Sequence, residues 1–187
     1  VHRLDKDTTG LLVVAKTLAA HKSLVDQLQC RSVYREYRAL VTGALVAGGK
    51  IDAPIGRHPL HRTRMAVVPS GKPAVTHYRV HERFHGHTLL AVRLETGRTH
   101  QIRVHMAHIQ HPLVGDRTYG GRPRPPSGAD PRLVSALTGF PRQALHAMAL
   151  GLEHPKTGEV MRWEAEMPED LCELLAWLRA EGRHGVD

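Results

Sequence analysis

The sequence predicts a single α+β domain over residues 1–187, built on a mostly antiparallel mixed β-sheet with flanking helices. Two stretches, 73–84 and 87–95, alternate apolar and polar residues with the period of a β-strand. The residues that join them, 84–87, are few enough to close a hairpin. Helical periodicity is confined to a few stretches, and no internal repeat or interdomain linker interrupts the chain. We therefore expect one core.

The first third of the chain predicts a strand, a helix and a second strand. Gly10–Ala15 is a short apolar run rich in strand-forming residues, which predicts a buried strand. Thr17 can cap a helix that runs to about Gln29, with apolar side chains four residues apart on one face. Glu36–Thr42 alternates again, so Tyr37 and the other odd-numbered residues share one face of a strand. A turn-rich, glycine-containing connection follows.

The second half predicts two helices, a long loop and a strand pair. A tight turn at Gly97 leads into a helix over residues 100–110. Residues 117–142, crowded with Gly, Pro and Arg, predict an ordered loop with a short helix near its end. Residues 150–166 predict a strand, a turn and a strand, and Pro168 starts the last helix. The apolar stripe of that helix is Leu171, Leu174, Leu175 and Leu178.

Composition narrows the class of protein. With 41% hydrophobic residues the chain can bury a core, and no run approaches the roughly 18 apolar residues of a membrane span. Cys30 and Cys172 form no CxxC pair, so we read them as buried or incidental thiols in a reducing cytoplasm. The formal net charge of +8 and the pI near 10.0 favour a polyanionic partner, most commonly a nucleic acid.

Three segments concentrate polar residues where packing alone would not require them. They are HRLDKDTTG at residues 2–10, YRAL at 37–40 and LETGRTHQIRVH at 94–105. Here the sequence resembles the RluA-type pseudouridine synthases. HRLDKDTTGLLVVAKT is similar to the motif around that family's nucleophilic aspartate, TGRTHQIRVH to its arginine-bearing motif, and YRAL to the stretch with its active-site tyrosine. The similarity continues through HRTRMAVVPSGKPAVTHYRV, HPLVGDRTYGGRPRPP and QALHAMALGLEHPKTGE, and so spans nearly the whole chain.

The resemblance implies the catalytic fold of that family and a role for individual residues. Asp5 would be the nucleophile, Tyr37 would pack on the target base, and Arg103 would be the charge partner of the Asp5 carboxylate. The substrate would be RNA, most closely the 23S ribosomal RNA of the large subunit, and the enzyme a cytoplasmic monomer without a cofactor or metal. The residues expected at the RNA surface and in the loop before Arg103 are His2, Arg3, Arg98, Thr99, His100 and Gln101.

These residue types suit the chemistry. Isomerising uridine breaks a C–N glycosidic bond, turns the uracil and joins its C5 to the same ribose carbon, without redox change. A carboxylate such as Asp5 can act as covalent nucleophile. The planar guanidinium of Arg103 can hold that carboxylate in one orientation. The base must leave its stack to react, and the Tyr37 ring offers it a surface, with a hydroxyl that can take part in proton transfer.

Other interpretations of the same residues stay open at this point. Asp5 could cap a helix or be only a salt-bridge partner, Tyr37 could be only a core residue of its strand, and Arg103 could be a solvated helix residue. The chain could also be a non-catalytic RNA-binding module with the same fold. A third hypothesis is a metal-dependent RNA hydrolase, because histidines recur at positions 100, 105, 108 and 111.

The sequence begins only one residue before the HRLD motif. The resemblance implies an upstream strand with a lysine-containing motif and, in the most similar members, an S4-type RNA-binding domain before it. We therefore expect the chain to be truncated at its N-terminus.

Overall fold

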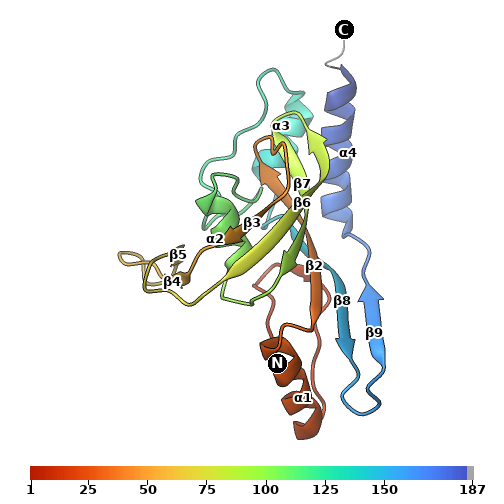
Figure 1. Ribbon diagram of the computed structural model, residues 1–187. Helices are drawn as coiled ribbons and strands as arrows, with labels where there is room; N and C mark the ends of the chain where they lie inside the picture. The colour runs from red at the N-terminus through yellow and green to blue at the C-terminus, as the bar shows by residue number, and fades with distance from the viewer. Residues whose placement is uncertain (185–187) are drawn as a thin grey trace.

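The computed structural model describes residues 1–184 and confirms the predicted α+β class (Figure 1). Its helices are α1 (Leu18–Gln29), α2 (Gln101–His108), α3 (Pro131–Gly139) and α4 (Glu169–His184). Its strands are β1 (Thr9–Gly10), β2 (Tyr34–Thr42), β3 (Gly49–Asp52), β4 (Ile55–Arg57), β5 (Met65–Val67), β6 (Val75–Phe84), β7 (His87–Leu94), β8 (Leu145–Glu153) and β9 (Val160–Glu164).

Seven strands form one sheet in the order β1-β8-β2-β7-β6-β3, and β9 also pairs with β8. Every pairing in it is antiparallel except that of β1 with β8, so the predicted mixed sheet is confirmed. The predicted hairpin of β6 and β7 closes at Phe84, which pairs with His87. β4 and β5 form a separate two-stranded hairpin that projects from the main sheet (Figure 1).

The two faces of the sheet carry different helices. Tyr37 and Val41 of β2 face one way, as predicted, into a core cluster that α2 covers with Ile102 and Met106. Leu40 faces the other way, into a cluster formed with α3 and α4. α1 lies at one end of the molecule, away from α3, and packs against β8 (Figure 1). The N-terminal segment therefore lies at the same end of the sheet as α1.

The helix predictions are confirmed in detail. Thr17 caps α1, and its hydroxyl oxygen accepts a hydrogen bond of 3.1 Å from the Ala20 N–H. The four leucines predicted as the apolar stripe of the last helix are all buried. Within residues 1–184, no helix combines the length and the apolar character that crossing a bilayer requires.

The predicted buried strand over Gly10–Ala15 is wrong in extent. Only Thr9 and Gly10 form a strand, and Leu12 and Val14 are 48% and 72% exposed. The alternate side chains of this segment do pack, against the cluster beneath α1. The apolar run therefore follows the sheet edge as an extended segment that is covered on one side only.

Two further expectations are corrected. The connection after Thr42 contains β3, β4 and β5, which are three or four residues long and interrupted by glycine and proline, so they leave no alternating pattern. Cys30 and Cys172 are free thiols and both are exposed, which excludes the buried alternative and agrees with incidental thiols.

The α4 packing gives a first test. Leu175 is fully buried against the sheet, so Leu175→Ala leaves a cavity and should lower the free energy of unfolding by about 2–5 kcal/mol. The exposed neighbour Glu173 is the control, and Glu173→Ala should change stability by less than about 0.5 kcal/mol. Urea denaturation of both variants measures the difference, and equal stabilities would contradict this placement of α4.

Candidate active site

The segment before β1 forms a tight turn that presents Asp5. The Thr8 N–H donates a hydrogen bond of 3.0 Å to the Asp5 carbonyl, which closes the turn. The amide of Gln143 donates to the Lys6 carbonyl at 2.6 Å and to the Thr8 hydroxyl at 3.0 Å. Leu4, on the other side of Asp5, packs against the core beneath α2. The aspartate is thus fixed by the residues on both sides of it.

Gly10 anchors the same segment to the sheet. It has a φ of +104°, and a Cβ at this position would lie 2.2 Å from the Ala147 carbonyl oxygen. Only glycine allows β1 to run this close to β8. Next to this contact β2 and β8 shift register between Glu36 and Tyr37, a β-bulge of the kind that re-aims side chains beside active sites.

Arg103 lies between two carboxylates. Its Nε and Nη2 donate to the two oxygens of Asp116 at 2.7 and 2.9 Å, and its Nη1 lies 3.4 Å from Oδ2 of Asp5. All three side chains are largely buried, with exposed fractions of 8% for Arg103, 13% for Asp5 and 0% for Asp116. Burial alone would lower the pKa of Arg103, but the hydrogen bonds and charges of the two carboxylates raise it. Arg103 is therefore a permanent cation, held by Asp116 and turned toward Asp5.

Asp116 is itself held by the turn that follows it. Its Oδ1 also accepts hydrogen bonds from the N–H groups of Thr118 and Tyr119, at 2.9 and 3.1 Å. The Tyr119 ring faces the Arg103 guanidinium, 5.0 Å from ring centroid to Cζ. The Tyr119 hydroxyl accepts from the Met65 N–H at 3.0 Å and shares a hydrogen bond of 2.7 Å with Nδ1 of His100. Tyr119 therefore connects Met65 of the β4–β5 hairpin to Asp116 and Arg103.

Tyr37 lies on the face of β2 that points to Asp5, and only 6% of it is exposed. It packs in the core beneath α2 and also lines the cavity that contains Asp5. Burial raises the pKa of its hydroxyl, the positive charge of Arg35 acts in the opposite direction, and Asp5 raises it further. Tyr37 is therefore a neutral phenol at neutral pH.

The turn into α2 is built by backbone strain and one buried amide. His100 precedes the helix with a φ of +56°, in the left-handed region that few residues other than glycine adopt. The Gln101 oxygen accepts from the Thr96 hydroxyl at 2.8 Å and from the Arg98 N–H at 2.9 Å. Its NH₂ group donates to the Val75 carbonyl and to Thr76. Gln101 therefore supports the turn, and its amide is already engaged inside the protein.

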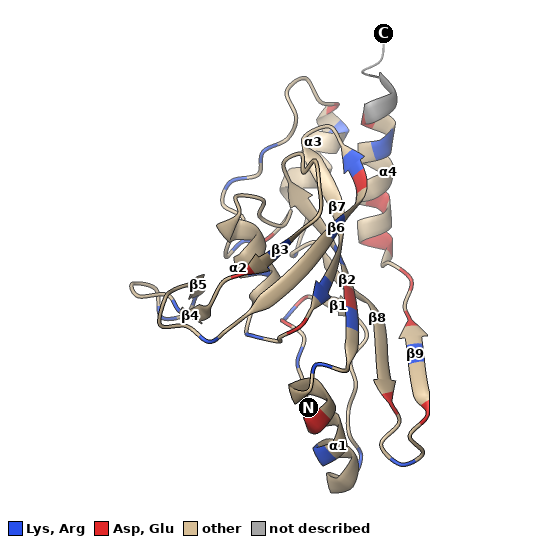
Figure 2. Ribbon diagram, viewed as in Figure 1, with Lys and Arg blue, Asp and Glu red and all other residues tan. Residues whose placement is uncertain are grey.

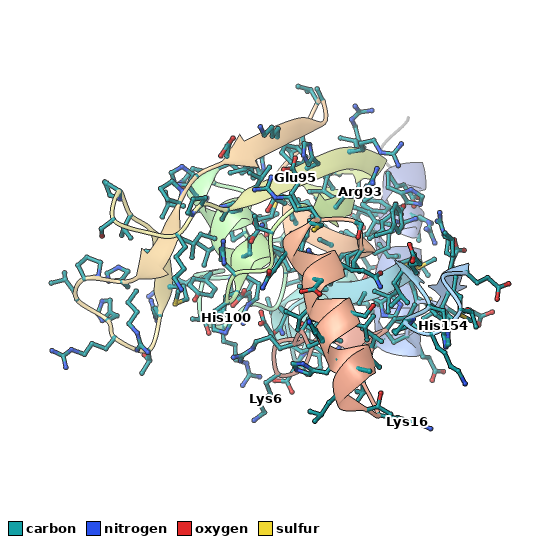
Figure 3. All side chains as sticks on the ribbon, turned by 60° about the horizontal axis from the view of Figure 1, so that its bottom comes forward. Lys6, Lys16, Arg93, Glu95, His100 and His154 are labelled. Atoms are coloured by element: carbon teal, nitrogen blue, oxygen red, sulfur yellow. The ribbon has the colours of Figure 1, made fainter. Side chains whose placement is uncertain are left out.

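These segments enclose a cavity of about 600 Å³ between the Asp5 turn, α1, β2 and the turn before α2. In Figure 3, which brings this end forward, His100 and Lys6 lie on the same side of the molecule near α1. Two of the predicted site residues do not line the cavity. Arg103 contacts the Asp5 carboxylate without reaching the cavity itself, and Thr99 is half-buried elsewhere on the turn before α2. The predicted site residues that line the cavity are Asp5, Tyr37, His2, Arg3, Arg98, His100 and Gln101.

The cavity wall is positively charged. Arg3, Arg35 and Arg98 line it, and Asp5 is the sole carboxylate among its lining residues within the described chain. Outside the cavity, Lys and Arg recur along β2, β6 and the long loop after α2, with acidic residues among them on the strands, and α4 carries residues of both signs (Figure 2). The net positive charge of the cavity wall therefore suits a polyanion, and Asp5 is the one negative group among the described lining residues.

Sequence reasoning missed Asp116 and Tyr119, although both stand in the run HPLVGDRTYGG that carried part of the resemblance. A lone aspartate in a glycine-rich loop gives no signal of an arginine thirteen residues earlier. Three of the four histidines considered as a metal site have other partners. His100 bonds to the Tyr119 hydroxyl, the buried His105 bonds to Thr76 and to the Ala53 carbonyl, and His111 bonds to the Thr42 carbonyl.

The buried ion pair gives a stability test. Asp116→Asn removes the charge that Arg103 needs, so it should lower the free energy of unfolding by about 3–5 kcal/mol. The control is Glu82→Gln, which breaks the partly exposed pair with Arg179 and should cost about 1 kcal/mol or less. Both are measured by chemical denaturation. A loss no greater in Asp116→Asn than in the control would show that Arg103 does not depend on Asp116.

His2 gives a pH test. Its Nε2 accepts a hydrogen bond of 3.1 Å from the Val13 N–H, and burial, helped by the charge of Arg35, lowers its pKa to about 4. Because the unfolded chain binds this proton with a pKa near 6.5, stability should fall as the pH falls from 6.5 to 4. His2→Gln should therefore lose less stability than wild type between pH 7 and pH 5. Imidazole NMR titration checks the cause, and a midpoint near 6.5 would refute it.

Comparison with known proteins identifies the family. The family profile described as RNA pseudouridylate synthase matches residues 1–108. Proteins named ribosomal large subunit pseudouridine synthase D are similar to the chain over 181 residues, 97% of its length. The identity is 61% for Pasteurella multocida (strain Pm70) and 62% for Escherichia coli (strain K12). The chain spans 56% of the length of these relatives.

Two solved structures have the same fold. Human RNA Pseudouridylate Synthase Domain Containing 1 is 31% identical with a TM-score of 0.74, over 94% of this chain and 71% of that one. Human RNA Pseudouridylate Synthase Domain Containing 4 is 25% identical with a TM-score of 0.75, over 95% and 74%. The resemblance in the sequence motifs is thereby confirmed, and the chain belongs to the RNA pseudouridylate synthase family.

Proposed function

We infer that this chain isomerises uridine to pseudouridine in RNA, with Asp5 as the nucleophile. The observation that carries the proposal is the place of Asp5, in a cavity with Tyr37 on its wall and Arg103 against its carboxylate. A volume of about 600 Å³ lies within the range of small-molecule sites and suits one nucleotide. Asp5 and Tyr37 are thereby available to the same bound uridine.

The residues match the bonds that change. The N1–C1′ bond of uridine breaks, C5 bonds to C1′, the C5 proton leaves, and N1 gains a proton. Asp5 carries the covalent step, because a carboxylate can form an adduct that splits one difficult rearrangement into two easier ones. Arg103 orients Asp5 while giving its two shorter hydrogen bonds to Asp116. Asp5 is positioned without being tied into a bidentate ion pair, which leaves its carboxylate able to react.

Tyr37 supplies the surface for the base. A uridine in a stem has to leave its stack to reach Asp5, at a cost that contacts in the cavity must offset. The aromatic ring of Tyr37 can stack on the flipped uracil, and its neutral hydroxyl can donate or accept a proton during the rearrangement. Four further side chains line the cavity and can contact the RNA strand: His2, Arg3, Arg98 and His100.

The proposed substrate is ribosomal RNA of the large subunit. Support comes from the relatives named for that activity, which match 97% of the chain at 61% and 62% identity. The net charge of +8 favours such a polyanion. Two alternatives have less support. A purely RNA-binding module gives no reason for a buried carboxylate between Arg103 and Tyr37, and a metal-dependent hydrolase would need His105, whose two ring nitrogens bond within the core.

Asp5→Asn tests the proposal. The amide keeps the shape of the carboxylate and removes the nucleophile, so tritium release from [5-³H]uridine-labelled ribosomal RNA should fall by roughly 10⁴-fold or more. RNA affinity should remain largely intact, because the fold and the cationic cavity wall are unchanged.

Asp7→Asn is the matched control. Asp7 is exposed two residues away, with a φ of +69° that asparagine tolerates, and its side chain has no place in the proposed site. This variant should release tritium at the wild-type rate. Unchanged release in Asp5→Asn would remove Asp5 as the nucleophile, and RNA cleavage abolished by a chelator would favour the hydrolase.

A further inference from the structure

One buried cation in the cavity wall has no hydrogen-bond or ion-pair partner within the described part of the chain. Arg35 lies on β2, two residues before Tyr37, and is 7% exposed. Its Nε is fully buried, and nothing within residues 1–184 hydrogen-bonds to it. Burial lowers the pKa of this guanidinium, and Tyr37 acts in the opposite direction. An unpaired buried charge destabilises the folded chain, so a retained one calls for a ligand.

Two other arginines with little-exposed side chains, Arg103 and Arg142, show the contrast. Arg103 binds Asp116 through two nitrogens, and Arg142 binds Asp170 through two nitrogens at 2.8 and 2.7 Å. Arg35 has no comparable carboxylate. Tyr37 is not its counter-ion, because burial keeps the phenol protonated.

The guanidinium lies against the turn that leads to α2. A Cβ on Gly97 would come within 2.8 Å of Nη1 of Arg35, so the glycine makes room for it. Arg35 is also close enough to His2 to lower the pKa of that imidazole. His2, Arg35, Tyr37 and Gly97 all line the cavity that contains Asp5. The unpartnered charge therefore borders the space proposed for the uridine, although Arg35 also lines a second cavity that adjoins β6 and β7.

We propose that Arg35 binds a backbone phosphate of the RNA strand next to the flipped uridine. This inference rests on the proposed function and adds the group that anchors the nucleotide. Uracil and ribose are uncharged, so the phosphodiester is the anion that a uridine in RNA brings into the cavity. The planar fork of arginine matches two phosphate oxygens. Binding there holds the strand while the base occupies the space beside Tyr37 and Asp5.

A phosphate scan tests the contact. In an Asp5→Asn background, which prevents turnover, a stem-loop of large-subunit ribosomal RNA is bound with a neutral methylphosphonate at one linkage at a time. One linkage beside the target uridine should weaken binding by about tenfold, the effect of losing one charged hydrogen-bond pair. Adding Arg35→Met should weaken binding of unmodified RNA to a similar extent, abolish the effect of that linkage, and reduce the salt-dependence slope by about one.

Two controls separate contact from folding and from bulk charge. Arg179→Met removes one charge from the surface, where Arg179 pairs with Glu82, and should leave the effect of the methylphosphonate intact. Gly97→Ala keeps the charge but displaces the guanidinium, so it should reduce the same effect. Because Arg35 is unpaired in the free protein, Arg35→Met should keep or raise the thermal midpoint while losing RNA affinity.

The opposite results overturn the proposal. If the neutral linkage still weakens binding when Arg35 is Met, or if Arg35→Met lowers stability without changing affinity, Arg35 is a structural residue. These binding measurements do not depend on tritium release. A failed assay of wild-type turnover would reject the proposed reaction and leave the phosphate contact to be judged on its own result.

Discussion

The site depends on one guanidinium that lies between two carboxylates. Arg103 comes from α2, Asp5 from the segment before β1, and Asp116 from the loop after α2, so one side chain joins three parts of the chain. A buried arginine is stable only when its charge is paired and its N–H groups are bonded. Asp116 meets most of that need, and its own turn fixes where it sits. The position of Asp5 therefore follows from the folding of a loop more than a hundred residues away from it.

The same arrangement, an arginine paired with an aspartate, contacts the N-terminal segment at two points. Arg142 gives Nε and Nη2 to Asp170 at the start of α4 and turns Nη1 toward the Asp7 carbonyl, 3.4 Å away. Arg103 gives Nε and Nη2 to Asp116 and turns Nη1 toward the Asp5 carboxylate, at the same distance. In both cases the bidentate pair holds the arginine and the remaining nitrogen places the loop. A turn that has little secondary structure of its own is thus fixed by charges anchored in α2 and α4.

The sequence predicted best what is decided locally. Thr17 marked the start of α1, and the leucine spacing of α4 identified its buried face, because both signals lie within a few residues of one another. The family motifs led us to expect Tyr37 and Arg103 near Asp5, but not the two hydrogen bonds by which Asp116 holds Arg103. That pairing depends on how a glycine- and arginine-rich loop folds back. Leu12 and Val14 show the converse, since apolar residues predict burial but these two side chains are exposed in the structure.

The charges of the cavity separate into those that serve the fold and those left for a ligand. Arg103 is satisfied within the protein before any ligand arrives, so it can orient Asp5 at no further cost to the complex. Arg35 is buried beside the same space without a carboxylate, which makes the empty state less favourable than the occupied one. Binding an anion there relieves an unpaired charge, and the energy released offsets unstacking of a base from its helix. The basic surface attracts any polyanion at long range. The buried Arg35, in contrast, favours an RNA strand whose phosphate can enter the cavity.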